Sequence, residues 1–284
     1  MRIKNKNSVP FLILFIIHTF LICLAFYKSK NKKNALIFLG TVMGFAYLLE
    51  FFVLNLFKGY KYKPKVLKNK SLDNILGGFL SQSIFVPFTA VYLTITKSGL
   101  IKKLLGGVYF SLIEIIFLRL GLYEHNWWRT TYTLILIPIY FLLSDIWYYL
   151  LVKKNELVRK LSFFLLIMVT ETNLFLILAI LRKIRFGWGR YHAWTEHFLI
   201  TPLYSITISI ATYFTLKKQN NGWAKLKILL FDASLYQIFV KTNILKTKIK
   251  LFNYILMKGV MVMVYGAYRK WVLGEIEFKQ SDTK

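Results

Sequence analysis

Cysteine and acidic residues are scarce in this chain of 284 residues. The single cysteine, Cys23, excludes an internal disulfide and a cysteine-rich metal site. Charged residues make up only 18% of the sequence, whereas hydrophobic residues make up 56%. A soluble domain of this length could not bury so much apolar surface, so the composition excludes an ordinary soluble fold.

Sequence motifs for nucleotide binding and for serine-hydrolase chemistry are also missing. The run Gly187-Trp188-Gly189 neither follows a predicted strand nor carries the Gly-Lys-Ser or Gly-Lys-Thr ending of a phosphate-binding loop. No serine lies in a nucleophile elbow. We therefore predict no cofactor, and we favour a non-enzymatic function over an enzymatic one.

Long apolar runs dominate what is present. A helix of about 20 apolar residues crosses the hydrocarbon core of a bilayer. Runs near this length predict an all-α, polytopic transmembrane helical bundle with eight or nine spans. The first run is predicted to be an uncleaved span, because no small-residue cleavage site follows it. The run 226–240 either crosses the membrane or lies on it. The runs cover residues 9–27, 35–57, 74–96, 104–122, 133–152, 161–181, 198–216, 226–240 and 251–272.

The net charge of +27 comes from 39 lysine and arginine residues spread in small groups between the apolar runs. Basic loops beside membrane spans attract anionic lipid headgroups, so we expect the lipid bilayer to be the partner and predict no nucleic acid. A multi-pass protein of a cell membrane is predicted. Heavy use of lysine, asparagine and isoleucine is typical of an AT-rich bacterial genome.

An internal repeat is visible when the chain is aligned on its prolines. From Pro138 and from Pro202, tyrosines follow at two and eleven residues and a Lys-Lys pair follows at fifteen and sixteen. Pro87 shares only the Lys-Lys pair. Within one transmembrane domain, 1–284, this register predicts three tandem two-helix hairpins, 35–103, 104–154 and 155–218. A first span and basic loop (1–34) precede them, and C-terminal spans and a tail (219–284) follow. The alternative is that proline and tyrosine are simply common in membrane helices.

One intramembrane acid lies in the first apolar run of each predicted hairpin, one helix before its proline: Glu50, Glu114 and Glu171. A charge at the bilayer centre costs roughly 2.5–3.5 kcal/mol, so these side chains should face protein or water. They predict either a path or site for protons or cations, or hydrogen bonds that hold helices together. Asp145 is not matched in the other hairpins and is the better single candidate for function. Arg119 could neutralise an acid of a neighbouring span.

The corner between the helices of the second hairpin has a pattern of residues that resembles a known protein family. The residues are Glu114, Gly121, Tyr123, His125, Trp127, Trp128, Tyr132 and Pro138. Over 112–154 the chain resembles a family of uncharacterised multi-spanning integral membrane proteins of spore-forming Gram-positive bacteria. The resemblance implies membrane location and no particular activity. Within the chain, the corner 123–127 is echoed by 191–194.

The histidines indicate a second possible kind of site, a metal site. His192 and Glu196 lie four residues apart on one predicted helix face, with His197 adjacent, and together with His125 they could ligate iron or zinc. The alternative is an interfacial belt of histidine and tryptophan. We predict a membrane transport or binding component with intramembrane acids. The alternatives are a membrane metalloenzyme and a structural envelope protein. The sequence specifies neither the substrate nor the oligomeric state.

Overall fold

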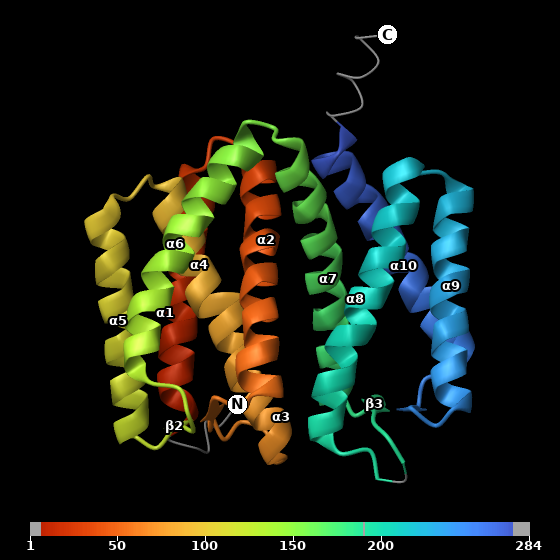
Figure 1. Cartoon of the computed structure of the whole chain (residues 1–284), viewed down its shortest axis with the longest axis horizontal. Coiled ribbons are helices and arrows are strands. Elements are labelled where there is room, and N and C mark those ends of the chain that lie inside the picture. Colours follow the sequence, from red (N-terminus) through yellow and green to blue (C-terminus); the bar gives the residue numbers. More distant parts are fainter. Residues whose placement is uncertain (1–6, 190, 275–284) are drawn as a thin grey trace. The chain divides into compact units, whose positions relative to one another are not determined.

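The computed structural model describes residues 7–189 and 191–274 and divides the chain into two compact units (Figure 1). We call Met1–Lys153 the N-terminal unit and Lys154–Lys284 the C-terminal unit. The division falls between the second and third predicted hairpins. The end of the predicted tail, 275–284, lies outside the described residues.

The N-terminal unit contains long helices, two π-helical segments and two short strands. Asn31 and Asn69 begin two of its helices, since their side chains accept hydrogen bonds from backbone N–H groups of the first turn. The elements are α1 (Ser8–Lys28), α2 (Lys32–Glu50), η1 (Phe51–Leu56), β1 (Tyr60–Tyr62), α3 (Lys70–Phe79), η2 (Leu80–Phe85), α4 (Val86–Ile95), α5 (Leu100–Arg119), β2 (Tyr123–His125) and α6 (Thr130–Val152).

The C-terminal unit repeats this order without the first helix. Asn155 and Asn221 cap its first and third helices by the same contact with backbone N–H groups. Its elements are α7 (Glu156–Ile180), β3 (Ile184–Phe186), α8 (Trp194–Lys218), α9 (Gly222–Lys241), β4 (Leu245–Thr247) and α10 (Leu251–Val272).

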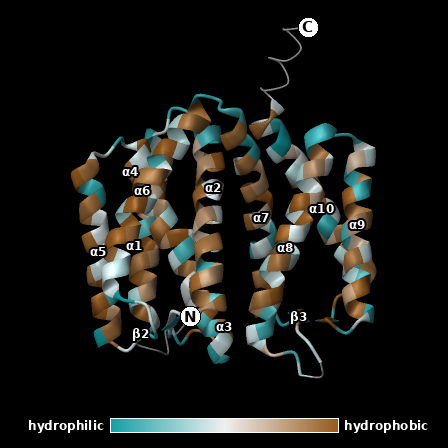
Figure 2. Cartoon of the chain, in the orientation of Figure 1, coloured by the Kyte–Doolittle hydropathy of each residue, from teal (hydrophilic) through white to brown (hydrophobic). Residues whose placement is uncertain are grey.

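The predicted all-α membrane class is confirmed. Among the described residues, seven helical segments are long and apolar enough to cross a membrane: α1, α2 with η1, α3 to α4, α6, α7, α8 and α10. Figure 2 shows their apolar character as brown ribbon joined by teal loops. The helices α5 and α9 carry more charge, but each has 20 residues and is therefore about 30 Å long. Each packs along the next helix of its own unit, so the run 226–240 belongs to a full-length helix.

The corners of consecutive hairpins are joined by strand pairs. β1 pairs antiparallel with β2, and β3 pairs antiparallel with β4. The region predicted as C-terminal spans thus supplies a fourth hairpin, α9 to α10. The strands couple the hairpins two by two: α2 to α4 with α5 to α6, and α7 to α8 with α9 to α10. In Figure 1 the labelled strands lie at one end of the helices of their unit.

The two units share the same backbone hydrogen bonds around these strands. In each unit, the backbone N–H group of the residue after the first strand donates a hydrogen bond to the backbone carbonyl of the residue before the second strand. The backbone N–H group of the residue after the second strand likewise donates a hydrogen bond to the backbone carbonyl of the residue before the first strand. The pairs are Lys63 with Leu122 (2.8 Å), Gly187 with Ile244 (2.9 Å), Asn126 with Gly59 (2.9 Å) and Lys248 with Lys183 (2.8 Å). Backbone hydrogen bonds therefore join the hairpins in pairs, and each unit contains the same pattern of strand pairing.

One part of the predicted register needs correction. The segment 191–194 was expected to match the corner 123–127, but the strand of the third hairpin is β3, 184–186. The segment 191–194 follows that strand and leads into α8. Aromatic residues are common at membrane interfaces, and this explains the false match.

The proline register reflects helix packing and local contacts. The ring of Pro138 packs against Gly107 so closely that a Cβ atom on Gly107 would lie 2.6 Å from it. A glycine at this point lets α5 and α6 approach each other, as small residues do in membrane bundles. The lysines of the register, Lys153 and Lys217, each lie 5.7 Å from the ring of the tyrosine one turn earlier.

Candidate functional site

Every hairpin carries one acid beyond the first turn of its first helix. The four are Glu50 at the end of α2, Glu114 in α5, Glu171 in α7 and Asp232 in α9. Asp232 was not among the predicted site residues, although it follows Glu171 by 61 residues, close to the 64 and 57 that separate the first three acids. Asp145 lies instead in α6, the second helix of its hairpin.

Glu50 is buried where three segments of the N-terminal unit meet. The Tyr60 hydroxyl donates a short hydrogen bond to its carboxylate, and Gln82 of η2 lies within hydrogen-bonding reach. Gly78 of α3 makes this approach possible, because a Cβ atom there would lie 2.6 Å from Glu50 Oε1. The carboxylate therefore joins α2 to β1 and to the α3–η2 segment.

Glu114 accepts hydrogen bonds from the corner and from α6. Thr130 Oγ1 donates to it at 2.8 Å, and Thr133 donates a shorter bond. His125 Nε2 lies 2.7 Å from Glu114 Oε1. This acid and Glu50 both bond groups near the strand end of the unit.

The N-terminal unit contains a cavity of about 120 Å³. Glu114 forms part of its wall, and so does Tyr60, the partner of Glu50. Aromatic rings supply much of the remaining wall: Phe11, Tyr62, Phe85, Phe110, Phe117, Tyr123, Trp128 and Tyr140. An engineered apolar cavity of about 150 Å³ holds benzene, so this one is large enough for a small organic group.

The charges of both acids affect the pKa values of two tyrosines in the strands. Burial raises the pKa of Tyr62 well above its usual value, and the charges of Glu50 and Glu114 raise it further. Burial likewise raises the pKa of Tyr123, with the same two carboxylates adding to the effect of Tyr62. The two acids thus raise the pKa values of the same two tyrosines. The phenol groups stay neutral and can donate hydrogen bonds.

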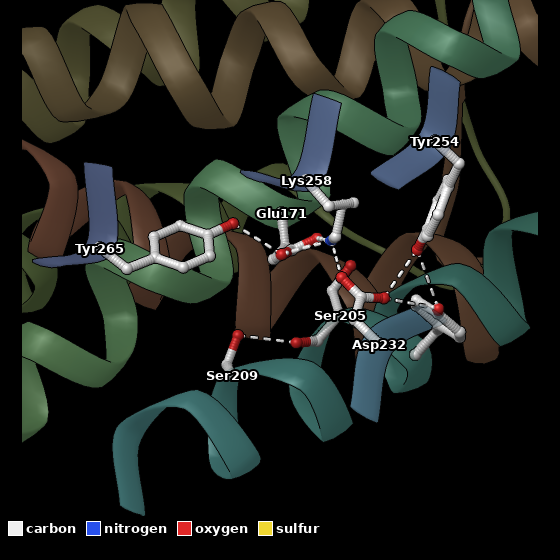
Figure 3. Close-up of polar contacts among 8 residues, drawn as sticks. Glu171, Ser205, Ser209, Asp232, Tyr254, Lys258 and Tyr265 are labelled. Atoms are coloured by element: carbon white, nitrogen blue, oxygen red, sulfur yellow. Dashed lines mark hydrogen bonds and ion pairs between the residues drawn. The ribbon is translucent and has the colours of Figure 1, made fainter. Parts of the chain in front are cut away.

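In the C-terminal unit the corresponding acids hold a lysine (Figure 3). Lys258 of α10 lies with its Nζ atom 2.6 Å from both carboxylate oxygens of Glu171 and 2.7 Å from Asp232 Oδ2. All three side chains are at most 1% exposed. Two carboxylates therefore enclose one ammonium group inside this unit.

Aromatic residues complete the surroundings of this ammonium group. The Tyr265 hydroxyl donates to Glu171 at 2.6 Å, and the hydroxyls of Tyr254 and Tyr204 donate to Asp232 at 2.7 and 2.9 Å. The rings of Phe175 and Tyr254 lie 5.4 and 5.9 Å from Lys258 Nζ, within the range of a cation–π contact. We call Glu171, Asp232, Lys258, Tyr204, Tyr254 and Tyr265 the lysine cluster.

The equivalent place in the N-terminal unit has no lysine. Lys258 follows the first residue of β4 by 13 positions, and the same count from the first residue of β2 reaches Leu136. Leu136 and its neighbour Ile137 both line the cavity. At this count from its strand, the N-terminal unit therefore has an apolar residue beside the cavity instead of a lysine.

No family model, curated protein or solved structure matches this chain. The resemblance to membrane proteins of spore-forming bacteria stays a prediction, and the geometry carries the functional argument.

Asp145 is paired within the N-terminal unit. Lys103 of α5 forms an ion pair with it, and Thr94 Oγ1 donates to Asp145 Oδ1 at 2.6 Å. Lys103 belongs to the Lys-Lys pair that follows Pro87, and its side chain is only 5% exposed because it turns inward to this partner. Arg119 ends α5, is exposed and forms no ion pair with any described residue. The cations that neutralise intramembrane acids are thus Lys103 and Lys258.

Replacing Asp145 by asparagine is expected to lower the free energy of unfolding by about 1–2 kcal/mol, because buried Lys103 loses a charged partner. The effect stays moderate because Asp145 is 36% exposed and Lys103 is close enough to the helix end to extend outward. Thermal unfolding monitored by circular dichroism measures it. The double variant Asp145→Asn with Lys103→Met should recover most of the loss. Equal destabilisation in both variants would contradict the pairing.

The predicted metal ligands are divided between the two units. His125 belongs to the N-terminal unit, whereas His192, Glu196 and His197 belong to the C-terminal unit. Glu196 accepts hydrogen bonds from the backbone N–H groups of Trp188 and Ala193 at 3.2 and 2.9 Å. His197 Nδ1 accepts one from the backbone N–H of residue 186. Within residues 7–189 and 191–274, no group of three or more such side chains is placed to hold a metal.

Proposed function

We propose that this chain is a transport or binding component of a bacterial cell membrane, and that it binds a small organic ammonium ion in the cavity of the N-terminal unit. The observation that carries the proposal is the contrast between the units. The lysine cluster holds an ammonium group between two acids and aromatic rings. The cavity is lined by one acid, Glu114, and by aromatic rings.

The cavity has the chemistry that such a ligand requires. Tyrosine and tryptophan rings attract cations through their electron-rich faces, and the effect grows when water is excluded. Glu114 in the wall and Glu50 behind Tyr60 add negative charge. A volume of about 120 Å³ favours an ammonium group with few carbon atoms, such as choline or methylammonium.

Backbone irregularity at the same place supports a functional role. The segments η1 and η2 are π-helical, a geometry that occurs often at functional sites. The first begins directly after Glu50, and the second contains Gln82. Pro87 follows η2 and lacks the N–H group that a regular helix would use.

The acids of the C-terminal unit have a different task in this proposal. Their charges are met by Lys258 and their oxygens by tyrosine hydroxyls, so they hold the four helices of that unit together. The basic loops of the chain are proposed to contact anionic headgroups of the surrounding bilayer.

Glu114→Gln is expected to weaken choline binding about tenfold or more, since a hydrogen-bonded carboxylate near the cation is replaced by a neutral amide. Isothermal titration of the full chain in detergent measures the dissociation constant. The neutral analogue 3,3-dimethylbutan-1-ol should bind much more weakly than choline. Glu124→Gln is the matched control, because this exposed acid of β2 lies outside the cavity.

Equal affinity for choline and its neutral analogue would remove the argument for a cation site. If neither choline nor methylammonium binds the wild-type chain, Glu50 and Glu114 serve only to join helices.

A further inference from the structure

A basic pocket of about 390 Å³ lies at the strand end of the C-terminal unit. Five basic side chains and one tryptophan form most of its wall: Arg182, Lys183, Arg185, Lys246, Lys248 and Trp194. None of the described residues that line it is acidic. So much positive charge in one pocket favours an anionic ligand.

The strand pair beneath this pocket places like charges opposite each other. Arg185 of β3 is the direct partner of Lys246 of β4. At the same position of the N-terminal unit, Lys61 of β1 faces Glu124 of β2, an opposite pair. Like charges directly opposite destabilise a strand pair. The C-terminal unit thus keeps an unfavourable pair where the N-terminal unit has a favourable one.

The N-terminal unit has an ion pair beside its own strand pair. Lys63 Nζ lies 2.6 Å from Glu124 Oε2, and its hydrogen bond and charge hold the pKa of that carboxyl below its usual value. Both ends of this contact are half-exposed. No described acid lines the corresponding pocket of the C-terminal unit.

Two contacts hold the guanidinium of Arg185 in place. Its guanidinium lies 4.2 Å from the ring of buried Trp194, and Nη1 lies 3.4 Å from the backbone carbonyl oxygen of His192. A guanidinium fixed on an aromatic ring retains further N–H donors, whose planar arrangement matches two oxygens of a phosphate.

We propose that this pocket binds a phosphate or diphosphate group, and that an anionic membrane lipid supplies it. Exposed Trp188 and Tyr191 lie beside the start of α8, and such aromatic residues gather at the level of lipid headgroups. Basic pockets between membrane helices bind anionic headgroups there. This inference does not depend on the cation cavity of the N-terminal unit.

Lys246→Glu tests the proposal because it gives the C-terminal unit the opposite charge pair that the N-terminal unit already has. The full chain is placed in detergent micelles that contain dioleoyl-phosphatidylglycerol or dioleoyl-phosphatidylcholine, and retained lipid is quantified by native mass spectrometry. We expect preferential retention of phosphatidylglycerol by the wild type. The variant should bind it about 25-fold more weakly, since each of two charge units is worth about fivefold.

Stability separates loss of the site from loss of the fold. Lys246→Glu should unfold at the wild-type temperature or above, because an opposite pair replaces a like pair. Lys250→Glu makes the same charge change at an exposed residue outside the pocket and should leave lipid retention nearly unchanged. If Lys246→Glu does not fold, Lys248→Gln provides the same comparison with one charge removed.

Inorganic pyrophosphate, titrated in phosphatidylcholine micelles, distinguishes the source of the phosphate. The wild type could bind pyrophosphate and lose this binding in Lys246→Glu, yet show no preferential retention of phosphatidylglycerol. This result would support a phosphate site whose ligand is soluble. Unchanged phosphatidylglycerol retention in Lys246→Glu overturns the proposal. Failure of the wild type to bind either compound overturns it as well.

Discussion

Lys258→Ala is expected to lower the free energy of unfolding by about 3–5 kcal/mol, the loss typical when one partner of a buried ion pair is removed. The variant leaves Glu171 and Asp232 facing each other inside the C-terminal unit, with no ammonium group between them. Thermal unfolding of the full chain in detergent, followed by circular dichroism, measures the change. Lys241→Ala at the end of α9 is the control and should have little effect.

Small ammonium ions should restore part of this stability. The alanine variant opens space between the two carboxylates, so methylammonium can replace the lost group and donate hydrogen bonds to both. Tetramethylammonium has no N–H group and should restore much less. A loss below about 1 kcal/mol in Lys258→Ala, or no response to methylammonium, would contradict the role assigned to the lysine cluster.

The membrane spans could be predicted from the sequence because each depends on local composition. The run 104–122 corresponds to α5, Leu100–Arg119, and the run 251–272 coincides with α10. Hydrophobic length and polar interruptions are properties of neighbouring residues, so no tertiary contact is needed to find them. Even the fourth hairpin was present as two apolar runs, although only three hairpins were predicted.

The strands and their pairing could not be predicted in this way. β1 and β2 have three residues each, too few for an alternating pattern to stand out. Tyr60 pairs with His125 across a whole hairpin, and nothing local specifies that partner. The aromatic echo between 123–127 and 191–194 was misleading for the same reason.

The site was predicted in part. Glu50 and Glu114 were predicted as intramembrane acids of two separate hairpins, since an acid in an apolar run is conspicuous, and the structure places both in the N-terminal unit. Asp145 was predicted as the better single candidate for function, and the structure shows that it pairs with Lys103. Lys258 is the one charged residue in the middle of the apolar run 251–272. Its contact with Glu171 joins residues 87 positions apart, which periodicity cannot reveal.

Leu136→Lys is expected to abolish choline binding while the chain remains folded. The substitution places an ammonium group in the N-terminal unit at the position that Lys258 occupies relative to β4. With Glu114 and the tyrosine rings of the cavity around it, the new lysine should take the place of the ligand. Lysine in contact with lipid would instead destabilise the protein by roughly 2.5–3.5 kcal/mol.

Titration of choline into Leu136→Lys and into the size-matched neutral control Leu136→Met tests the central claim most directly. We predict that the methionine variant binds choline within a few-fold of the wild type. The lysine variant should show no measurable binding and should unfold at a temperature no lower than that of the methionine variant. Choline binding by the lysine variant with wild-type affinity would contradict the account.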